Sequence, residues 1–272
     1  MAKLGFIVIF ICVTISAWAH EDHLGELGAR VEECRGHFCI RFYSNQEIAS
    51  SRRGFRHYLV EVGLDGAVLR KKHEEVREPT VGRSLEKVVN GVRTRDRKQT
   101  FAVKPGQHAP GAKLFLYRLE KKKVVERIPL PLGKLSVEWI DSMVVRGESV
   151  YLLLAEHDSN DLCLLHLEEG GRKLVKRLKL EGVYKPYMFP TVSDLGFYGD
   201  AVFVVWVNWG GNLTLTRFDP VSGERKDEVL HEEVTGNSQL SMKIIGNTLL
   251  VAYQVLNKKN SRSSVEWSFR KI

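Results

Sequence analysis

Long apolar stretches are scarce in this sequence, and only one of them lies where it bears on targeting. The run from Leu4 to Ile15 is about a dozen residues long, shorter than the roughly 20 that a membrane-spanning helix needs. It follows the positively charged Lys3 and precedes Ala17-Trp18-Ala19, a small-x-small pattern typical of signal peptidase sites. We therefore predict a signal peptide over residues 1–19 and a secreted or periplasmic domain over residues 20–272, not embedded in a membrane.

Cysteine is also scarce, with four residues in the chain. Cys12 lies in the predicted signal peptide, which leaves an odd number in the mature chain. Cys34 and Cys39 are close enough to form a disulfide in an oxidising compartment. Cys163 lies inside an apolar run, which predicts a buried thiol. A Cys-x4-Cys pair without a second pair is a poor zinc ligand set, so we expect no metal and no other cofactor.

Helix signals are rare too, and the chain is instead a series of short runs rich in Val, Leu, Phe, Tyr and Trp, bounded by turn residues. One strand-like pattern recurs at offsets of 56, 48, 51 and 52 residues, beginning at Tyr58, Leu114, Leu162, Leu213 and Val265. Periods of this length in β-rich sequence are typical of propeller blades. We predict an all-β, single-domain β-propeller of about five four-stranded blades, with six as the alternative.

The repeats are clearest in the second half of the chain. Gly147, Gly199 and Gly246 each lie between two strand-like runs, at separations of 52 and 47 residues. The run that follows Gly199 is apolar at every position. Val202, Val204 and Trp206 are expected on one face and Phe203, Val205 and Val207 on the other. Strands that are apolar on both faces are buried between layers, as the middle strand of a blade would be.

The two ends of the chain also bear on the fold. The last repeat stops after its third strand, and we expect a strand from within Leu24 to Glu33 to complete that blade. Residues 77–99 form a long basic insertion in the first half, where the blade boundary is left open.

The net charge is +8, from 41 basic and 33 acidic residues, and clusters such as Arg70-Lys71-Lys72 and Lys121-Lys122-Lys123 lie in the first half. One interpretation is solvated turns and edge strands, where lysine discourages strand pairing. The other is a surface that attracts acidic partners, such as anionic glycans or lipid head groups. Nucleic acid is not expected, because export argues against it and no recognition-helix or stacking-strand signature is present.

Two segments resemble known propeller repeats. Leu213 to Glu224, LTLTRFDPVSGE, resembles the strand, turn and strand of many exported propellers, and Val202 to Arg217 resembles the middle strands of sialidase-like propellers. The resemblance implies a blade and leaves the reaction open. Thr191 to Phe197 departs from the Asp-box spacing of sialidases, and the sialidase arginine triad has no counterpart that we can assign.

Five-bladed glycosidases place carboxylates on their inner strands, and hydrolysis needs two of them about 5–10 Å apart. The position five residues before the turn glycine holds Ser142, Asp194 and Ser241. Asp194, with Asp141 and Glu138 nearby on the equivalent strand, are therefore the candidate catalytic carboxylates. The alternative is that Asp194 and the serines form hydrogen bonds with loop backbone at the strand start.

Binding is the function that we expect from the sequence, with a glycan or a protein, acidic ones included, as the partner. The candidate ligand contacts are Trp139, Asp141, Asp194, Tyr184 and Tyr187. The linker from Tyr184 to Pro190 would bind if its aromatic residues are exposed and would pack between blades if they are buried. A sialidase-like or other glycoside hydrolase is the alternative, and a scaffold subunit of an envelope complex is a third reading. Whether Asn212, in an Asn-Leu-Thr sequon, is glycosylated is left open.

Overall fold

The computed structural model describes residues 25–47, 53–76, 92–93, 100–103, 106–120, 123–157, 159, 161–183, 193–234, 240–257 and 262–272. Apart from one short 3-10 turn, η1 (Glu169–Gly171), the elements of these residues are strands. Within the described ranges no helix has the length and apolar character needed to cross a membrane.

The strands form five antiparallel groups in chain order. The first contains β1 (Gly25–Cys34), β2 (His37–Glu47), β3 (Arg53–Val62) and β4 (Val68–Val76). The second contains β5 (Val92–Arg93), β6 (Thr100–Val103), β8 (Phe115–Glu120) and β9 (Lys123–Pro129). The third contains β10 (Val137–Arg146), β11 (Ser149–Glu156), β12 (Leu162–Glu168) and β13 (Lys173–Leu180), with β7 (Gly106–Gln107) added beside β10. The fourth contains β14 (Ser193–Tyr198), β15 (Ala201–Val207), β16 (Leu213–Phe218) and β17 (Arg225–His231), and the fifth contains β18 (Ser241–Ile245), β19 (Thr248–Asn257) and β20 (Arg262–Lys271).

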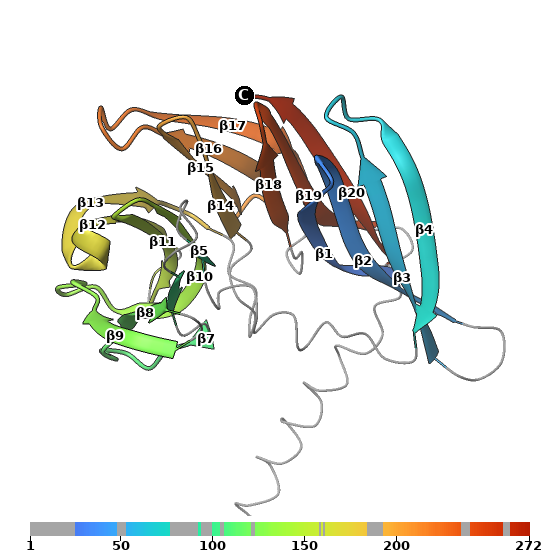
Figure 1. Cartoon of the computed structure of the whole chain (residues 1–272). Coiled ribbons are helices and arrows are strands. Elements are labelled where there is room, and N and C mark those ends of the chain that lie inside the picture. The colour runs from blue at the N-terminus through green and yellow to red at the C-terminus, as the bar shows by residue number, and fades with distance from the viewer. Residues whose placement is uncertain are drawn as a thin grey trace, which may run out of the picture.

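Each group is an up-and-down meander, the arrangement of a propeller blade. In Figure 1 the blades follow one another round an arc, from β5–β9 through β10–β13, β14–β17 and β18–β20 to β1–β4. Over the described residues the chain is a β-propeller of five blades, four with four strands and the last with three, as the repeat pattern predicts. We call these blades 1 to 5 in chain order.

Four apolar cores lie between successive blades, and the middle strands contribute to the cores on both sides. In β15, Val202, Val204 and Trp206 pack toward blade 3, whereas Phe203, Val205 and Val207 pack toward blade 5. The predicted division of this strand into two apolar faces is therefore confirmed. Every residue of β15 is buried, which explains why the strand lacks the polar alternation of a sheet with one face in water.

The predicted turn glycines are confirmed as well. Gly147, Gly199 and Gly246 all have φ of 58° and occupy the first position of two-residue hairpin turns. A left-handed φ at this position suits a type II′ turn, in which glycine is favoured because it has no Cβ. The repeated glycine thus sets the register between the first and second strands of three blades.

The N-terminal strand links the last blade to the first. β1 pairs with β2 along most of its length and lies next to β20 in the sheet, where Gly25 pairs with Ser263 in parallel. A strand from the predicted N-terminal segment therefore follows the third strand of blade 5, and the same strand begins blade 1.

Cysteine chemistry follows the sequence prediction. Cys34 and Cys39 form a disulfide across the β1–β2 turn. Cys163 is a free thiol buried in β12, and burial raises its pKa to about 11. A thiol that stays protonated at neutral pH is a poor nucleophile, so Cys163 acts as a small core residue.

Candidate functional site

Asp194 lies at the seams between three blades. Its Oδ1 accepts hydrogen bonds from the Ser142 hydroxyl of blade 3 at 3.0 Å and from the Leu195 backbone N–H at 2.8 Å. Its Oδ2 accepts the backbone N–H of Met242 in blade 5 at 2.8 Å. One carboxylate thus holds together the inner strands β10, β14 and β18.

A second contact runs in the reverse sense across the same seam. The Ser193 hydroxyl of β14 donates to Asp141 Oδ2 of β10 at 2.5 Å. The dipeptides Asp141-Ser142 and Ser193-Asp194 therefore exchange two serine–aspartate hydrogen bonds. We call these four residues the seam clasp. Two of the three candidate carboxylates, Asp141 and Asp194, lie on the strands β10 and β14, and each accepts a hydrogen bond from a serine hydroxyl of the other strand.

Burial dominates the electrostatics of Asp194. Removal of its carboxylate from water raises its pKa above the ordinary 3.8, and the N–H and O–H donors offset part of that rise. A raised pKa in a carboxyl group is a feature of general acids as well as of buried structural groups. The chemistry at this position is therefore read from its hydrogen-bond partners.

A similar hydrogen bond between inner strands is found between blades 5 and 1, at the position equivalent to Asp194. Ser241 of β18 accepts the backbone N–H of Val31 in β1 through its hydroxyl oxygen at 3.1 Å. Val31 itself stands five residues before Gly36 in the β1–β2 turn. The predicted column of Ser142, Asp194 and Ser241 is thus a set of contacts between inner strands, with backbone N–H groups of the neighbouring blade among its partners.

The other predicted residues are placed as follows. Glu138 accepts the backbone N–H of His108 at 2.8 Å through its backbone carbonyl. Trp139 packs against the core between blades 3 and 4. Tyr184 and Tyr187 lie outside the described residues.

The two ends of the propeller are distinguished by their connections. The loop end holds the connections between the second and third strands of each blade and the connections from one blade to the next. The turn end holds the connections between the first and second strands and between the third and fourth strands. Trp209, in the loop between β15 and β16, lies at the loop end with 54% of its surface exposed. Trp209 was not among the candidate ligand contacts predicted from the sequence, although a tryptophan inside a Gly- and Asn-rich turn was an available signal.

The loop that holds Trp209 is well hydrogen-bonded. The backbone N–H of Trp209 donates to the carbonyl of Gly182 at 2.7 Å, and the backbone N–H of Asn208 donates to the carbonyl of Asn212 at 3.0 Å. The Asn208 side chain also accepts the Asn212 N–H at 3.0 Å. Asn208 pairs with Val183, the last described residue before the aromatic linker. The exposed indole is therefore held on a rigid loop beside the point where that linker begins.

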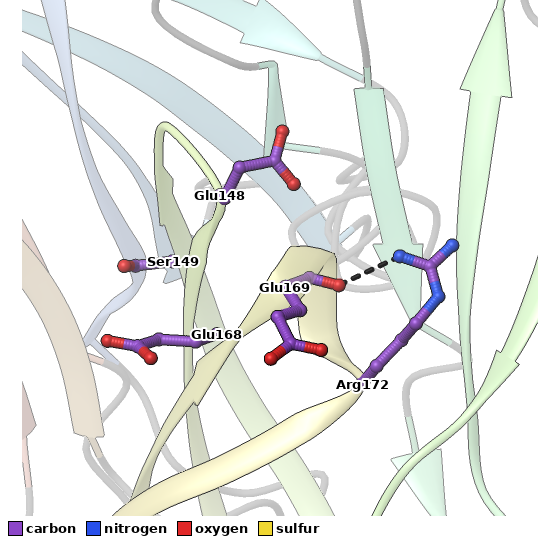
Figure 2. Close-up of a pocket in the computed structure, with 5 residues that line it drawn as sticks. All are labelled: Glu148, Ser149, Glu168, Glu169 and Arg172. Carbon is purple, nitrogen blue, oxygen red and sulfur yellow. Dashed lines mark hydrogen bonds between the residues drawn. The ribbon is translucent and has the colours of Figure 1, made fainter.

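A surface depression of about 520 Å³ lies at the turn end of blade 3. It is lined by Glu148, Ser149, Glu168, Glu169 and Arg172 (Figure 2). Arg172 donates to the Glu169 carbonyl at 2.8 Å and also binds Glu126 of blade 2. That hydrogen bond from Arg172 is the main reason why the pKa of Glu126 is lowered.

The depression does not resemble a catalytic or metal site. In Figure 2 the carboxylates of Glu148, Glu168 and Glu169 point in different directions instead of converging. Among the described residues no group of three His, Cys, Asp or Glu side chains is arranged to hold a metal ion. We interpret Arg172 as a structural residue that links blades 2 and 3 through its ion pair with Glu126.

Comparison with known proteins finds likeness in structure alone. No protein-family model and no curated protein matches the chain. Similar solved structures include the subtype N11 neuraminidase-like protein of A/flat-faced bat/Peru/033/2010 (H18N11), with 11% identity, TM-score 0.47 and coverage of 91% of this chain and 87% of that one. A GH43_1 enzyme from Xanthomonas citri complexed with xylose has 11% identity, TM-score 0.44 and coverage of 91% and 87%. The β-propeller domain of the Trilobed protease from Pyrococcus furiosus has 9% identity, TM-score 0.41 and coverage of 89% and 69%. None of these likenesses assigns an activity to this chain.

Proposed function

We propose that this chain is an interaction module that binds a glycan or a protein at the loop end of the propeller, around Trp209. The observation that carries the proposal is the exposure of Trp209 on a loop that is fixed by hydrogen bonds within the loop and to the carbonyl of Gly182. Trp209 is not among the residues of the apolar cores, which lie between the blades.

Tryptophan at such a position suits both kinds of ligand. Its flat apolar face and its N–H let it stack on a sugar ring or fill a pocket in a protein, and it loses little conformational entropy when it binds. Tyr184 and Tyr187 follow Val183 closely in the sequence, and Val183 pairs with Asn208 next to Trp209. We therefore include both tyrosines in the proposed binding surface.

The seam clasp supports binding over hydrolysis. A glycosidase needs one carboxylic acid to protonate the leaving group and a second carboxylate to act as base or nucleophile. Asp194 accepts hydrogen bonds from two backbone N–H groups and a serine hydroxyl, and Asp141 accepts one from Ser193. These contacts engage both oxygens of Asp194 and Oδ2 of Asp141, two of the three carboxylates on which the hydrolase alternative depends.

One observation keeps the hydrolase as a second candidate. Asp141 and Asp194 lie on adjacent inner strands, and burial raises the pKa of Asp194. Fluorogenic glycosides and sialosides test it directly, with Asp141→Asn as the variant. Turnover that this folded variant loses would replace our proposal, and lack of turnover by the wild-type protein would leave binding as the function.

The binding proposal is tested with a glycan array and saturation-transfer NMR on the mature chain. We expect Trp209→Ala to weaken binding about 30-fold, the effect of losing a hot-spot residue worth about 2 kcal/mol. Trp209→Phe keeps an aromatic face and should restore part of the affinity. Tyr198→Ala is the matched control, because Tyr198 is an exposed aromatic residue at the turn end.

The outcomes separate the possible ligands. Saccharide binding that Trp209→Ala abolishes and Tyr198→Ala leaves intact would establish a glycan site. If no saccharide binds, a photo-crosslinking residue at position 209 would report a protein partner. Equal binding by the wild type and Trp209→Ala would refute a site at the loop end.

A further inference from the structure

The hairpin of β3 and β4 presents exposed aliphatic side chains at the turn end of blade 1. Leu64 in the turn is 38% exposed, and Val68 and Leu69 at the start of β4 are 52% and 57% exposed. The three residues lie within six positions of the chain, and groups of exposed aliphatic residues mark interaction surfaces more often than isolated ones do.

Basic residues surround this hairpin tip. Arg70, Lys71 and Lys72 follow directly along β4 and are all exposed. Lys271, near the end of β20, is brought alongside from blade 5, where its ammonium donates to the Leu64 carbonyl at 2.9 Å. In Figure 1 the β3–β4 turn and the C-terminus lie together at the top of the view. We call Leu64, Val68, Leu69, Arg70, Lys71, Lys72 and Lys271 the basic tip.

Four acidic residues near the basic tip each have a partner nearby, and one of them, Glu74 of β4, lies 3.0 Å from His57. Asp65 accepts the Ala67 N–H within the turn at 3.0 Å. Glu61, opposite Arg70 in the ladder, lies 3.4 Å from His37. Glu228 of blade 4 accepts a hydrogen bond from Arg270. The tip therefore presents an excess of positive charge around an apolar centre.

The shape of the basic tip favours a flat partner. It is the end of a hairpin, and the depressions lined by residues of blades 2 and 3 do not include any of its residues. Surfaces that combine exposed aliphatic residues with lysine and arginine are typical of proteins that bind anionic lipid, with the apolar groups in the head-group layer.

We propose that the basic tip docks on an anionic lipid surface, at the end of the propeller opposite to Trp209. Leu64, Val68 and Leu69 enter the head-group region, while Lys72 and its basic neighbours contact lipid phosphates. The ligand site at the loop end then faces away from the membrane. This docking does not depend on the proposed glycan or protein binding.

Vesicle co-sedimentation tests the proposal on the full mature chain. The protein is mixed with phosphatidylcholine vesicles that contain either no anionic lipid or about 30% phosphatidylglycerol. We expect binding to the anionic vesicles only, and weaker binding at about 1 M salt, where screening is strong. Lys71→Glu/Lys72→Glu should lower the affinity at least about 30-fold, as expected for the loss of two surface cations.

Two matched variants separate the tip from the overall charge. Lys173→Glu/Lys226→Glu makes the same change in net charge at exposed sites on blades 3 and 4. Val68→Ser/Leu69→Ser is compared with Val124→Ser/Val125→Ser, an equally exposed aliphatic pair on blade 2. We expect both tip variants to lose binding and both controls to retain it.

Three results would overturn the proposal. The wild-type protein fails to bind anionic vesicles, the tip and control variants lose binding equally, or dextran sulfate binds as well as vesicles and the Val68→Ser/Leu69→Ser variant binds it normally. The last result would assign the basic tip to a soluble polyanion. Circular dichroism melts confirm that each variant is folded, and the charge and aliphatic variants test the surface independently.

Discussion

Replacement of Asp194 by alanine should loosen the packing of three blades at once. The substitution removes the acceptor of the Ser142 hydroxyl and of the Leu195 and Met242 backbone N–H groups. A buried donor left without a partner costs about 1–3 kcal/mol. Part of this cost is recovered, because a carboxylate that is unfavourably buried is removed at the same time. We therefore expect a loss of about 2–4 kcal/mol in the free energy of unfolding.

Urea denaturation monitored by tryptophan fluorescence measures this loss. With an m-value of about 3 kcal/mol/M, the midpoint should fall by about 1 M while the slope stays unchanged. Asp200→Ala is the control, because Asp200 binds Arg146 at 2.7 Å across the same pair of blades but is largely exposed. Exposed ion pairs contribute little, so its midpoint should hardly move. A shift for Asp194→Ala as small as that of the control would refute the role of the seam clasp.

The difference in the free energy of unfolding between the wild type and Asp194→Asn should depend on pH with a defined sign. The folded-state pKa of Asp194 lies above its ordinary 3.8, so folding favours the protonated carboxyl. The stability that this group contributes is present below pH 3.8 and is lost as the pH rises through the folded-state pKa. The wild type should therefore lose stability relative to Asp194→Asn as the pH rises through this window. A wild type that gains stability relative to Asp194→Asn as the pH rises would contradict burial as the dominant cause.

Three further predictions concern the cores, the turns and the buried histidine. Leu153→Ala, at a fully buried position between blades 3 and 4, should cost about 2–5 kcal/mol in urea denaturation, whereas Val175→Ala at an exposed position should stay within about 0.5 kcal/mol. Gly199→Ala should cost about 1–2 kcal/mol through its positive φ alone, since open space surrounds the new Cβ; Gly199→Asn should cost less in a thermal melt. Burial lowers the pKa of His166 below 6.5, so the wild type should lose stability relative to His166→Phe as the pH falls through 6.5 toward the folded-state pKa; parallel pH profiles would refute this.

The blade architecture was predictable because its signals are local. The two faces of β15 follow from a run that is apolar at every position, and the hairpin turn follows from Gly199. Period-2 geometry then assigns alternate residues to opposite faces without knowledge of the rest of the fold. The outcome was correct at each position from Val202 to Val207.

The role of Asp194 was harder to predict because its partners are distant in sequence. Ser142 lies 52 residues before it and Met242 lies 48 residues after it. These separations are close to the repeat length, and residues one repeat apart occupy equivalent places on neighbouring blades. The sequence aligned Ser142 with Asp194 in one column, but contact between members of a column depends on how closely the inner strands approach one another.

The exposure of Trp209 could not be predicted from the apolar–polar alternation of the sequence, for a different reason. In a strand, alternation decides whether a side chain is buried, but no period applies within a turn of five residues. Whether the indole folds over the blade or faces solvent depends on how Gly182 and Val183 pair with Trp209 and Asn208 of this loop. Neither bond has a signature in composition or spacing.

The separation of the two proposed surfaces follows from the same architecture. Antiparallel strands send their connections alternately to opposite ends, so Trp209 and the basic tip lie at opposite ends of the strands. The cores and the seam clasp lie between them and involve neither surface. Substitutions at Trp209 should therefore leave vesicle binding unchanged, and substitutions at Lys71 and Lys72 should leave ligand binding at the loop end unchanged. If either set of variants altered both activities, the two sites would not be independent, and one shared surface would have to explain them.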